Sequence, residues 1–567
     1  NQEGQGGQNF REDWGTGRTW TWTNTANYQK QIGEKHSIGA LLGYEALHSK
    51  GRSINGTLNN YFTVSEDAWY LTTGFGDASS RGVSSNGGEN KLLSTFGKVD
   101  YAYDDKYFVS ATIRRDGSSR FTPTNRFAVF PAFSLGWRIT GEDFLKDNSI
   151  INDLKLRASW GKTGNENIRS YNFVNRYGGG VGAASYDING TNNSAVAGYW
   201  QDGIGDPFTK WEQGINTNIG FDASLFNDKV TIVLDVYKRV TSDLLYNAQL
   251  PGTLGIATSP FSNIAQMTNT GIDLGLGYKG KVNKDFSYNI DLNISHYKNV
   301  IDKTDGITEF FYPNSAQGRI DNRLPIEFNI NQIGESISSF RGYVVEGIYD
   351  ANTTADELSK VKIGNAQVGG LRFKDINGDG EITEDDATII GSPHPSFTGG
   401  LNLGVSFKNF DLNAFFVGSY GNEIFNYVRL FTHFRQFNSN VDREYYLNNG
   451  TGGSPRLNIN DTASRLASSY YVEDGSYLRL GQLQIGYNIP LSAKNKAGMK
   501  SLKVYVQGQN LFTITGYSGL DPALSNANIG DFQGGVQGNF LNDLWTGFDL
   551  GQYPSNKMFT VGVNAEF

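Results

Sequence analysis

The sequence has no cysteine among its 567 residues, which excludes disulfide bonds and thiol chemistry. Its five histidines form no HExxH pattern, and no GxSxG pattern occurs, so common signatures of metal-dependent hydrolases and serine nucleophiles are missing. No apolar run approaches the roughly 18 residues that a membrane-spanning helix needs. The net charge of −8 at pH 7 disfavours a nucleic-acid partner. We therefore do not expect an enzyme, a nucleic-acid-binding protein or a helical membrane protein.

Glycine and aromatic residues are abundant instead. The chain has 70 Gly, 36 Phe, 30 Tyr and 9 Trp, a composition typical of strands, turns and the aromatic belts of membrane β-barrels. The stretch Thr398–Ser419 shows the strand pattern most clearly. Apolar residues alternate with polar or very small ones on both sides of the break at Lys408 and Asn409, which predicts two antiparallel strands joined by a tight hairpin. One face of this hairpin is apolar throughout, and the other is polar.

The same alternation recurs along the chain and predicts about fifteen strands. Short turns such as Asp104–Lys106 and Asn227–Lys229 alternate with long polar loops. This sorting is typical of outer-membrane barrels, which have short periplasmic turns and long external loops. In such a barrel the apolar face of each strand meets lipid and the polar face lines the lumen. We therefore predict an all-β protein, an antiparallel transmembrane β-barrel in a bacterial outer membrane.

The order of long and short connections also divides the chain. Residues 1–18 are polar and glycine-rich and are expected to form an external loop, and residues 19–567 are expected to form the C-terminal part of the barrel. The connection 298–396 is the longest external loop. Bacterial single-chain barrels have even strand numbers, so an odd number of strands is expected from an upstream polypeptide. The absence of an initiator Met and of a signal peptide indicates a fragment or a processed piece.

The longest connection contains the segment DINGDGEITEDD at residues 375–386. Its spacing matches a calcium-binding loop, in which oxygen ligands converge from positions 1, 3, 5, 7 and 12 around a sharp turn at a glycine. The residues at these positions are Asp375, Asn377, Asp379, Glu381 and Asp386. Position 12 is Asp rather than Glu, and no helix pattern precedes the segment, so a metal-free acidic turn is the alternative. We predict a Ca²⁺ ion with a structural role in bracing this loop.

Two other features allow more than one interpretation. The segment 160–163 resembles the end of a phosphate-binding loop, but Leu156 stands where that motif needs Gly, so nucleotide binding is not expected. The loop aromatics Tyr199, Trp200 and Trp211 could stack on sugars or peptides. Packing within the loops or at the membrane interface is the more common role of such residues, and we favour it here.

Several stretches, occurring in the family's order, resemble the SusC/RagA family of TonB-dependent transporters from Bacteroidota outer membranes. They lie at Arg114–Phe121, Leu154–Ile168, Phe373–Leu412, Asp474–Pro490 and Met558–Phe567, and the third is the most specific. The resemblance implies a barrel of about 22 strands with an N-terminal plug, so that the plug and about seven strands are absent from this chain. It also implies a SusD-like lipoprotein that caps the barrel, and coupling to TonB through the missing plug region.

We therefore interpret the chain as part of an importer that takes up a nutrient, either an oligosaccharide or an oligopeptide, by TonB-dependent transport. The alternatives are a passive porin and a barrel that serves as a surface binding or docking platform. An upstream plug distinguishes an importer from a porin, and co-purifying partners distinguish a docking platform. The sequence assigns no residue to substrate binding.

Overall fold

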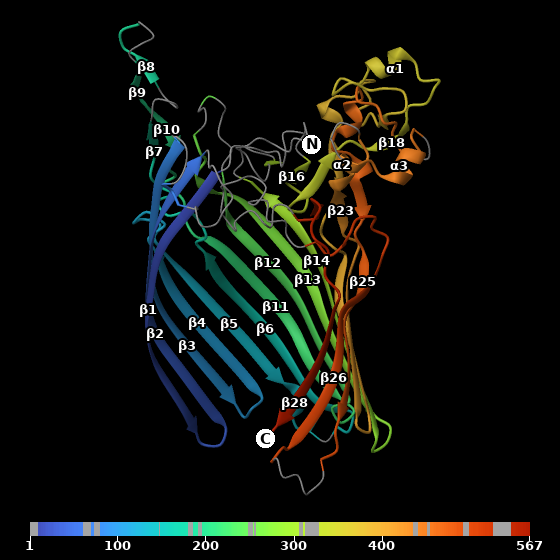
Figure 1. The fold of residues 1–567 in the computed structure, drawn as a ribbon. Helices are drawn as coiled ribbons and strands as arrows, with labels where there is room; N and C mark the ends of the chain where they lie inside the picture. Colours follow the sequence, from blue (N-terminus) through green and yellow to red (C-terminus); the bar gives the residue numbers. More distant parts are fainter. Residues whose placement is uncertain are drawn as a thin grey trace.

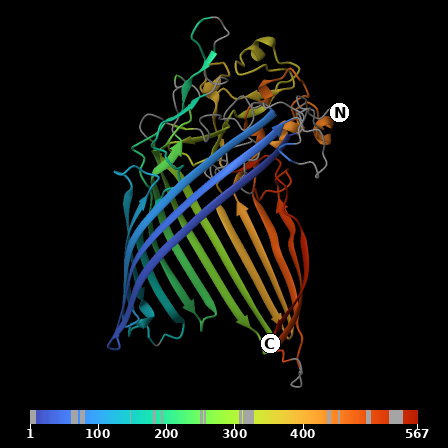
Figure 2. The same ribbon diagram turned by 60° about the vertical axis from the view of Figure 1, so that its left-hand side comes forward.

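Most of the chain belongs to one large sheet. The computed structural model describes residues 9–59, 70–72, 80–146, 148–179, 185–190, 195–247, 253, 257–304, 310–311, 328–434, 440–450, 454–491, 498–524 and 546–567. Fifteen strands in this part of the chain form a single sheet in sequence order. The all-β class is confirmed, and the number of strands agrees with the prediction. The sheet is curved and its strands are tilted (Figures 1 and 2).

Each strand of the sheet pairs antiparallel with the next. In order they are β1 (Asn9–Ile32), β2 (His36–Asn59), β3 (Arg81–Tyr103), β4 (Tyr107–Ser118), β5 (Phe127–Arg138), β6 (Ile151–Asn165), β11 (Glu212–Leu225), β12 (Val230–Asn247), β13 (Phe261–Lys281), β14 (Phe286–Lys303), β21 (Phe397–Phe407), β22 (Phe410–Tyr420), β25 (Tyr477–Asn488), β26 (Ser501–Thr515) and β28 (Met558–Glu566).

Tight turns join the strands at one end of the sheet. In the hairpin of β21 and β22, Phe407 pairs with Phe410, and Lys408 between them has a φ of 52°. Asp104 and Asp105, in the turn after β3, also have positive φ. Asp and Asn tolerate this left-handed region better than most residues, which explains the two aspartates in the turn after β3. The turns fix the register that keeps the apolar side chains on one face.

The long connections gather at the opposite end of the sheet, and the C-terminus lies at the end with the tight turns (Figure 1). The two ends are called the long-loop end and the short-turn end. In the connection between β6 and β11, four short strands project away from the sheet (Figure 1). These are β7 (Arg176–Gly179), β8 (Ser185–Asp187), β9 (Ala195–Ala197) and β10 (Tyr199–Gly203).

The first strands extend further than the sequence pattern predicts. The prediction of a loop over residues 1–18 is wrong for residues 9–18, because β1 begins at Asn9 and pairs with β2 as far as Asn59. Residues 1–8 lie outside the described part of the chain. The added segment is mostly polar on both faces, with Phe10 and Trp14 as its large apolar residues, so it carries little of the period-two signal that identifies a strand with one apolar face.

The sheet is open within the described residues. Its order begins at β1 and ends at β28, and no pairing joins these two strands in the part of the chain that the structure describes. Figure 1 shows them at the two edges of the curved sheet. The outer side of each edge strand therefore presents a row of backbone N–H and C=O groups without a neighbouring strand in this part of the chain.

The described parts of three long connections fold together into a lobe at the long-loop end (Figure 1). They follow β14, β22 and β26, and the first starts after Lys303 rather than at residue 298, because β14 is longer than predicted. Their helices are α1 (Ala355–Ser359), α2 (Val428–Thr432) and α3 (Arg443–Leu447), with short 3₁₀ turns between strands. Their strands are β15 (Phe310–Phe311), β16 (Asn329–Gln332), β17 (Ser339–Gly342), β18 (Val345–Ile348), β19 (Leu371–Phe373), β20 (Thr388–Gly391), β23 (Glu423–Asn426), β24 (Val472–Asp474) and β27 (Phe548–Asp549). Among the described residues, no helix has the length and apolar character required to span a membrane.

Candidate functional site

The two faces of the sheet differ in chemistry from strand to strand. Amide and hydroxyl side chains, with one glycine, share a register row across six strands: Asn289, Gly404, Asn413, Gln484, Gln507 and Thr560. The adjacent row, on the opposite face, is apolar: Tyr288, Val405, Leu412, Ile485, Val506 and Val561. The polar face is called the inner wall and the apolar face the outer wall. The polar inner wall can form hydrogen bonds with solutes, and the apolar outer wall can contact lipid. This arrangement suits a membrane pore.

Aromatic side chains surround the short-turn end of the outer wall. Tyr107 pairs with Trp137 across β4 and β5 and stacks on Tyr103 with ring centroids 6.3 Å apart. Further along the same wall, on β22 and β25, the ring of Phe410 contacts the ring of Tyr487, with centroids 4.7 Å apart. Rings of this kind favour the boundary between water and lipid, and they form a girdle at that level in outer-membrane barrels.

A charged cluster occupies the inner wall where β6, β11 and β12 adjoin. The Arg157 guanidinium donates two hydrogen bonds to Asp222, of 2.8 and 2.9 Å, and two to Asp235, both of 3.0 Å. A Cβ at position 220 would lie 2.5 Å from an Asp235 carboxylate oxygen, so Gly220 is required for this approach. The cluster borders a cavity of about 740 Å³ that Lys155 and Asp100 also line. The inner wall is therefore strongly charged at this level.

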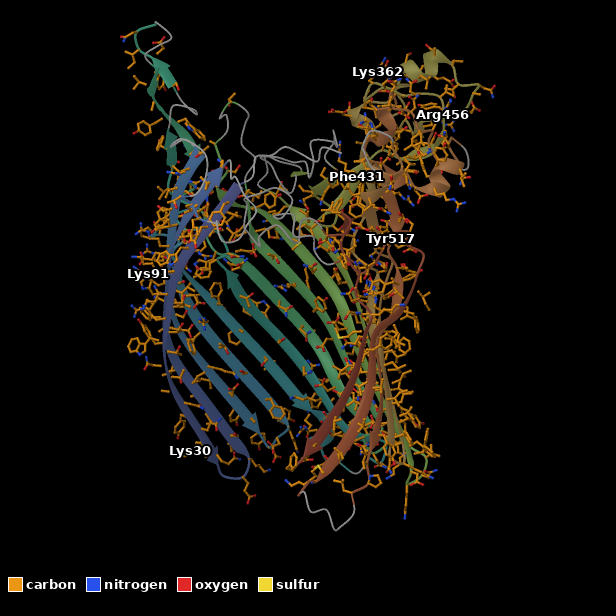
Figure 3. The ribbon with its side chains drawn as sticks, viewed as in Figure 1. Lys30, Lys91, Lys362, Phe431, Arg456 and Tyr517 are labelled. Atoms are coloured by element: carbon orange, nitrogen blue, oxygen red, sulfur yellow. The ribbon has the colours of Figure 1, made fainter. Side chains whose placement is uncertain are left out.

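The lobe has its own core, made of aromatic rings from all three connections. Phe328 and Phe340 from the first and Phe425 from the second surround Phe548 from the third, with ring centroids 4.9 to 5.5 Å apart. β23 pairs in parallel with β27, which ties the second connection to the third. At the base of the lobe, the Tyr517 hydroxyl donates to Asp549 Oδ2 at 2.6 Å (Figure 3). The lobe is thus a packed unit rather than three independent loops.

His433, at the end of α2, is expected to make the lobe sensitive to acid. Its ring stacks on Tyr445 with centroids 4.4 Å apart, and its Nδ1 lies 2.7 Å from the Tyr470 hydroxyl. Burial, helped by the charge of Arg429, lowers the pKa of His433 to about 4, against the pull of Asp442 and Glu473, which face it. The unfolded chain has a His pKa of about 6.5. The unfolded lobe therefore binds more protons between these two values, and its stability falls as the pH falls from about 6.5 to 4.

We expect proteolysis of the lobe to accelerate over this pH window in the wild type and less steeply in His433→Gln. Glutamine keeps a polar side chain at this position but cannot take up the proton. The measurement is the cleavage rate within residues 421–476, normalised at each pH to an unstructured peptide. An equal pH slope in the two proteins would assign the acid sensitivity to carboxylates instead.

The predicted calcium ligands lie in one short segment of the first connection, mostly exposed except for Asp386: Asp375, Asn377, Asp379, Glu381 and Asp386. Asp375 accepts hydrogen bonds from the N–H groups of Gly378 at 2.6 Å and Gly380 at 2.8 Å. Both glycines have positive φ, which gives the sharp turn that the spacing predicts. The first half of the segment therefore makes a sharp turn that suits a cation-binding loop and a metal-free acidic turn equally well.

Asp386 occupies a different environment from the other ligands. It is fully buried and accepts hydrogen bonds from the N–H groups of Ile376 and Thr383, both at 2.8 Å. Burial alone would raise the pKa of Asp386, but these N–H groups outweigh it and hold the pKa below the ordinary value. Within the described residues, no three His, Cys, Asp or Glu side chains are grouped closely enough to hold a metal ion. Calcium binding stays a prediction, and Asp386 fits it least, because its short side chain is used to close the turn.

If calcium braces this loop, chelation will increase the rate at which protease cuts residues 375–386 several-fold, and added Ca²⁺ will restore resistance. Asp375→Ala should remove this calcium dependence. Asp356→Ala, on α1 of the same connection, is the matched control and should retain it, because Asp356 lies outside the spacing. Identical cleavage with and without chelator in the wild type would favour the metal-free acidic turn.

Two other sequence features are settled by their surroundings. The phosphate-loop-like segment 160–163 lies inside strand β6, where no loop is free to wrap a phosphate. Trp211 is buried against Phe121 and Phe130, and its Nε1 donates to the Arg126 carbonyl at 3.0 Å. Trp211 is therefore a packing anchor, as favoured above, whereas Tyr199 is 78% exposed and does not have that role.

Comparison with known proteins identifies the family of this chain. The sequence model described as "TonB dependent receptor-like, beta-barrel" matches residues 1–511. The chain belongs to this TonB-dependent receptor β-barrel family. The β-barrel of this family resides in the outer membrane, so the strands cross that membrane, with the outer wall toward lipid.

Relatives of the TonB-dependent receptor family extend the resemblance. "TonB-dependent receptor P3" of Formosa agariphila is 33% identical over 96% of this chain and 52% of its own length. "TonB-dependent receptor SusC" of Bacteroides thetaiotaomicron is 28% identical over 87% of this chain and 45% of its own. The solved RagAB peptide transporter gives a TM-score of 0.78 at 26% identity, over 98% of this chain and 56% of the matched one. The predicted resemblance to SusC and RagA is confirmed, and these relatives are receptors rather than enzymes, as expected. The chain spans about half the length of the curated relatives it matches.

Sequence reasoning missed the polar groups that line this receptor barrel. The Arg157 cluster joins residues 65 and 78 positions apart in the chain. The polar rows of the inner wall also cross long connections, as between Asn289 and Gly404. The only signal in the sequence is that inner-wall positions are polar, which does not identify the row that each position joins.

Proposed function

We propose that this chain is the C-terminal part of a SusC-like transporter that imports an oligosaccharide or an oligopeptide across the outer membrane by TonB-dependent transport. The observation that carries the proposal is the combination of a continuous polar inner wall with a packed lobe above it at the long-loop end. The wall offers hydrogen bonds along the path of a solute. The similarity to SusC and to the RagAB peptide transporter supports import rather than passive diffusion.

The open sheet supports a larger barrel. Unpaired edge groups in lipid cost several kcal/mol each, so β1 and β28 require further strands between them. Transporters with a plugged lumen close with about 22 strands, which leaves about seven beyond the fifteen described here. We propose that sequence outside this chain supplies those strands, the plug and the segment that contacts TonB. A SusD-like lipoprotein seated over the long-loop end would act as the lid.

The test is purification through this chain in mild detergent, followed by mass spectrometry of everything that remains bound. We expect two findings: additional transporter sequence that includes a plug, and a separate SusD-like lipoprotein. Uptake of candidate nutrients is then compared in cells with and without TonB. Uptake that continues without TonB would indicate a passive porin, and partners without any uptake would indicate a docking platform. Either outcome overturns the proposal.

A further inference from the structure

A second cavity, of about 520 Å³, opens on the inner wall at the long-loop end. Its floor is formed by β14, β21, β22 and β25. Its rim is formed by Pro393 and Pro395, which precede β21, and by residues 522–524, which follow β26. The cavity therefore lies where a solute from outside first meets the barrel wall.

Hydroxyl groups line the floor of this cavity in one register row. The row crosses five strands and consists of Ser295, Thr398, Ser419, Tyr477 and Thr515. The first four line the cavity, whereas the Thr515 hydroxyl donates to the Ser476 carbonyl at 2.8 Å. Paired positions place their Cβ atoms about 4.5 to 5.5 Å apart, so one sugar unit can reach two neighbouring hydroxyls of the row. The Ser419 hydroxyl donates to Asn422 Oδ1 at 2.8 Å. No side-chain hydrogen bond joins Ser295 or Thr398 to another described residue, so both hydroxyls are available to a ligand.

An aromatic ring and an amide lie one to two rows below. Phe415 projects from β22 with 38% of its surface exposed. A Cβ at position 400 would lie 2.8 Å from Asn293 Oδ1 and 3.2 Å from the Phe415 ring, so Gly400 makes room for both side chains. A flat ring beside an amide suits a ligand that has both C–H faces and hydroxyl groups.

None of the described residues that line the cavity carries a charge. The next row of the same face contains Arg479, which pairs across the strands with Val417. The Arg479 side chain is only 8% exposed and forms an ion pair with Asp521. The cavity near Arg157 differs, because Asp100, Lys155 and Arg157 line it. An ionised ligand in the cavity at the long-loop end would lose water without gaining a counter-charge, which is unfavourable. A peptide that places a charged terminus or side chain in this cavity meets this penalty, and an uncharged sugar unit does not.

We propose that this cavity is a subsite for one unit of a neutral oligosaccharide, held by Ser295 and Thr398 through its hydroxyls and by Phe415 through its ring face. The assignment rests on the proposed import function and narrows its substrate class from oligosaccharide or oligopeptide to an uncharged oligosaccharide. The position of the cavity makes it an entry subsite, occupied before the solute reaches the charged wall near Arg157.

The test is calorimetric titration of the complete transporter, purified from the outer membrane with its natural partners. The probes are neutral gluco-, manno- and fructo-hexaoses, with hexagalacturonate and a mixture of hexapeptides as charged counterparts. The variants are Thr398→Val, which removes one hydroxyl at constant shape, and Phe415→Ala, which removes the ring. Ser406→Ala is the matched control, because it removes a hydroxyl from the same face of β21 near the short-turn end.

We expect at least one neutral hexaose to bind and each site variant to weaken it roughly tenfold, the effect of about 1.4 kcal/mol of lost contact, while Ser406→Ala leaves it unchanged. The subsite is overturned if no neutral hexaose binds, if the variants weaken the charged probes instead, or if the neutral probe binds all variants equally. Binding is measured without energy coupling, so it is independent of the import assay. If uptake depends on TonB but the variants bind the neutral hexaose as well as the wild type does, the subsite alone is rejected. If uptake is independent of TonB but the variants bind the hexaose more weakly, the import function alone is rejected.

Discussion

Replacing Ile219 by Arg is expected to reduce the assembly of the barrel in the outer membrane several-fold, whereas the same change at its neighbour Asn218 is expected to be tolerated. Ile219 lies in the middle of β11 on the outer wall and is 64% exposed. Its cross-strand partners are Ala158 and Val236, so an apolar surface surrounds it. Arg at the lipid-facing midplane of a barrel costs about 2–4 kcal/mol. Asn218 belongs to the polar inner wall and lines a cavity there, so an Arg at this position does not meet lipid.

The measurement is the amount of heat-modifiable, folded protein in outer-membrane fractions. We expect Ile219→Arg to reduce it several-fold and Asn218→Arg to match the wild type. Ile219→Val serves as a size control on the same face. If the two Arg variants behave alike, the division into a lipid-facing outer wall and a lumen-facing inner wall is incorrect.

The strands were predictable from the sequence wherever their two faces differ. The hairpin of β21 and β22 is the clearest case, because lipid selects apolar residues on one face and the lumen selects polar ones on the other. The first ten residues of β1 were missed for the opposite reason. Water surrounds a strand segment beyond the membrane on both faces, so nothing imposes an alternating pattern on Asn9–Arg18.

The candidate site was not predictable to the same degree. Alternation places Thr398 on the polar face, but only the register of three pairings brings it into one row with Ser295 and Tyr477. That register depends on turns and bulges, and on loops more than fifty residues long. The aromatic core of the lobe has the same origin, since Phe340 and Phe548 belong to different connections. The calcium spacing was local and easily found, but the burial of Asp386 depends on how the turn folds.

Replacing Arg479 by Met is expected to release the connection that follows β26 from the inner wall. The Arg479 guanidinium pairs with Asp521 and donates to Thr513 Oγ1 at 2.8 Å and Ser555 Oγ at 3.0 Å. Both ions are largely buried, with 8% and 12% of their side chains exposed. Removing one member of such a pair leaves the other charged and unpaired, which typically costs about 3–5 kcal/mol.

Hydrogen exchange of residues 516–524 should therefore accelerate by two to three orders of magnitude in Arg479→Met, since about 1.4 kcal/mol corresponds to a factor of ten. The heat-modifiability of the barrel should not change, because the strands keep their pairing. The double variant Arg479→Met/Asp521→Leu should exchange more slowly than Arg479→Met, because the remaining carboxylate, rather than the lost contacts, carries most of the penalty. If the double variant exchanges as fast as the single one, the pair does not hold this connection through buried charge, and its contacts with Thr513 and Ser555 are the cause instead.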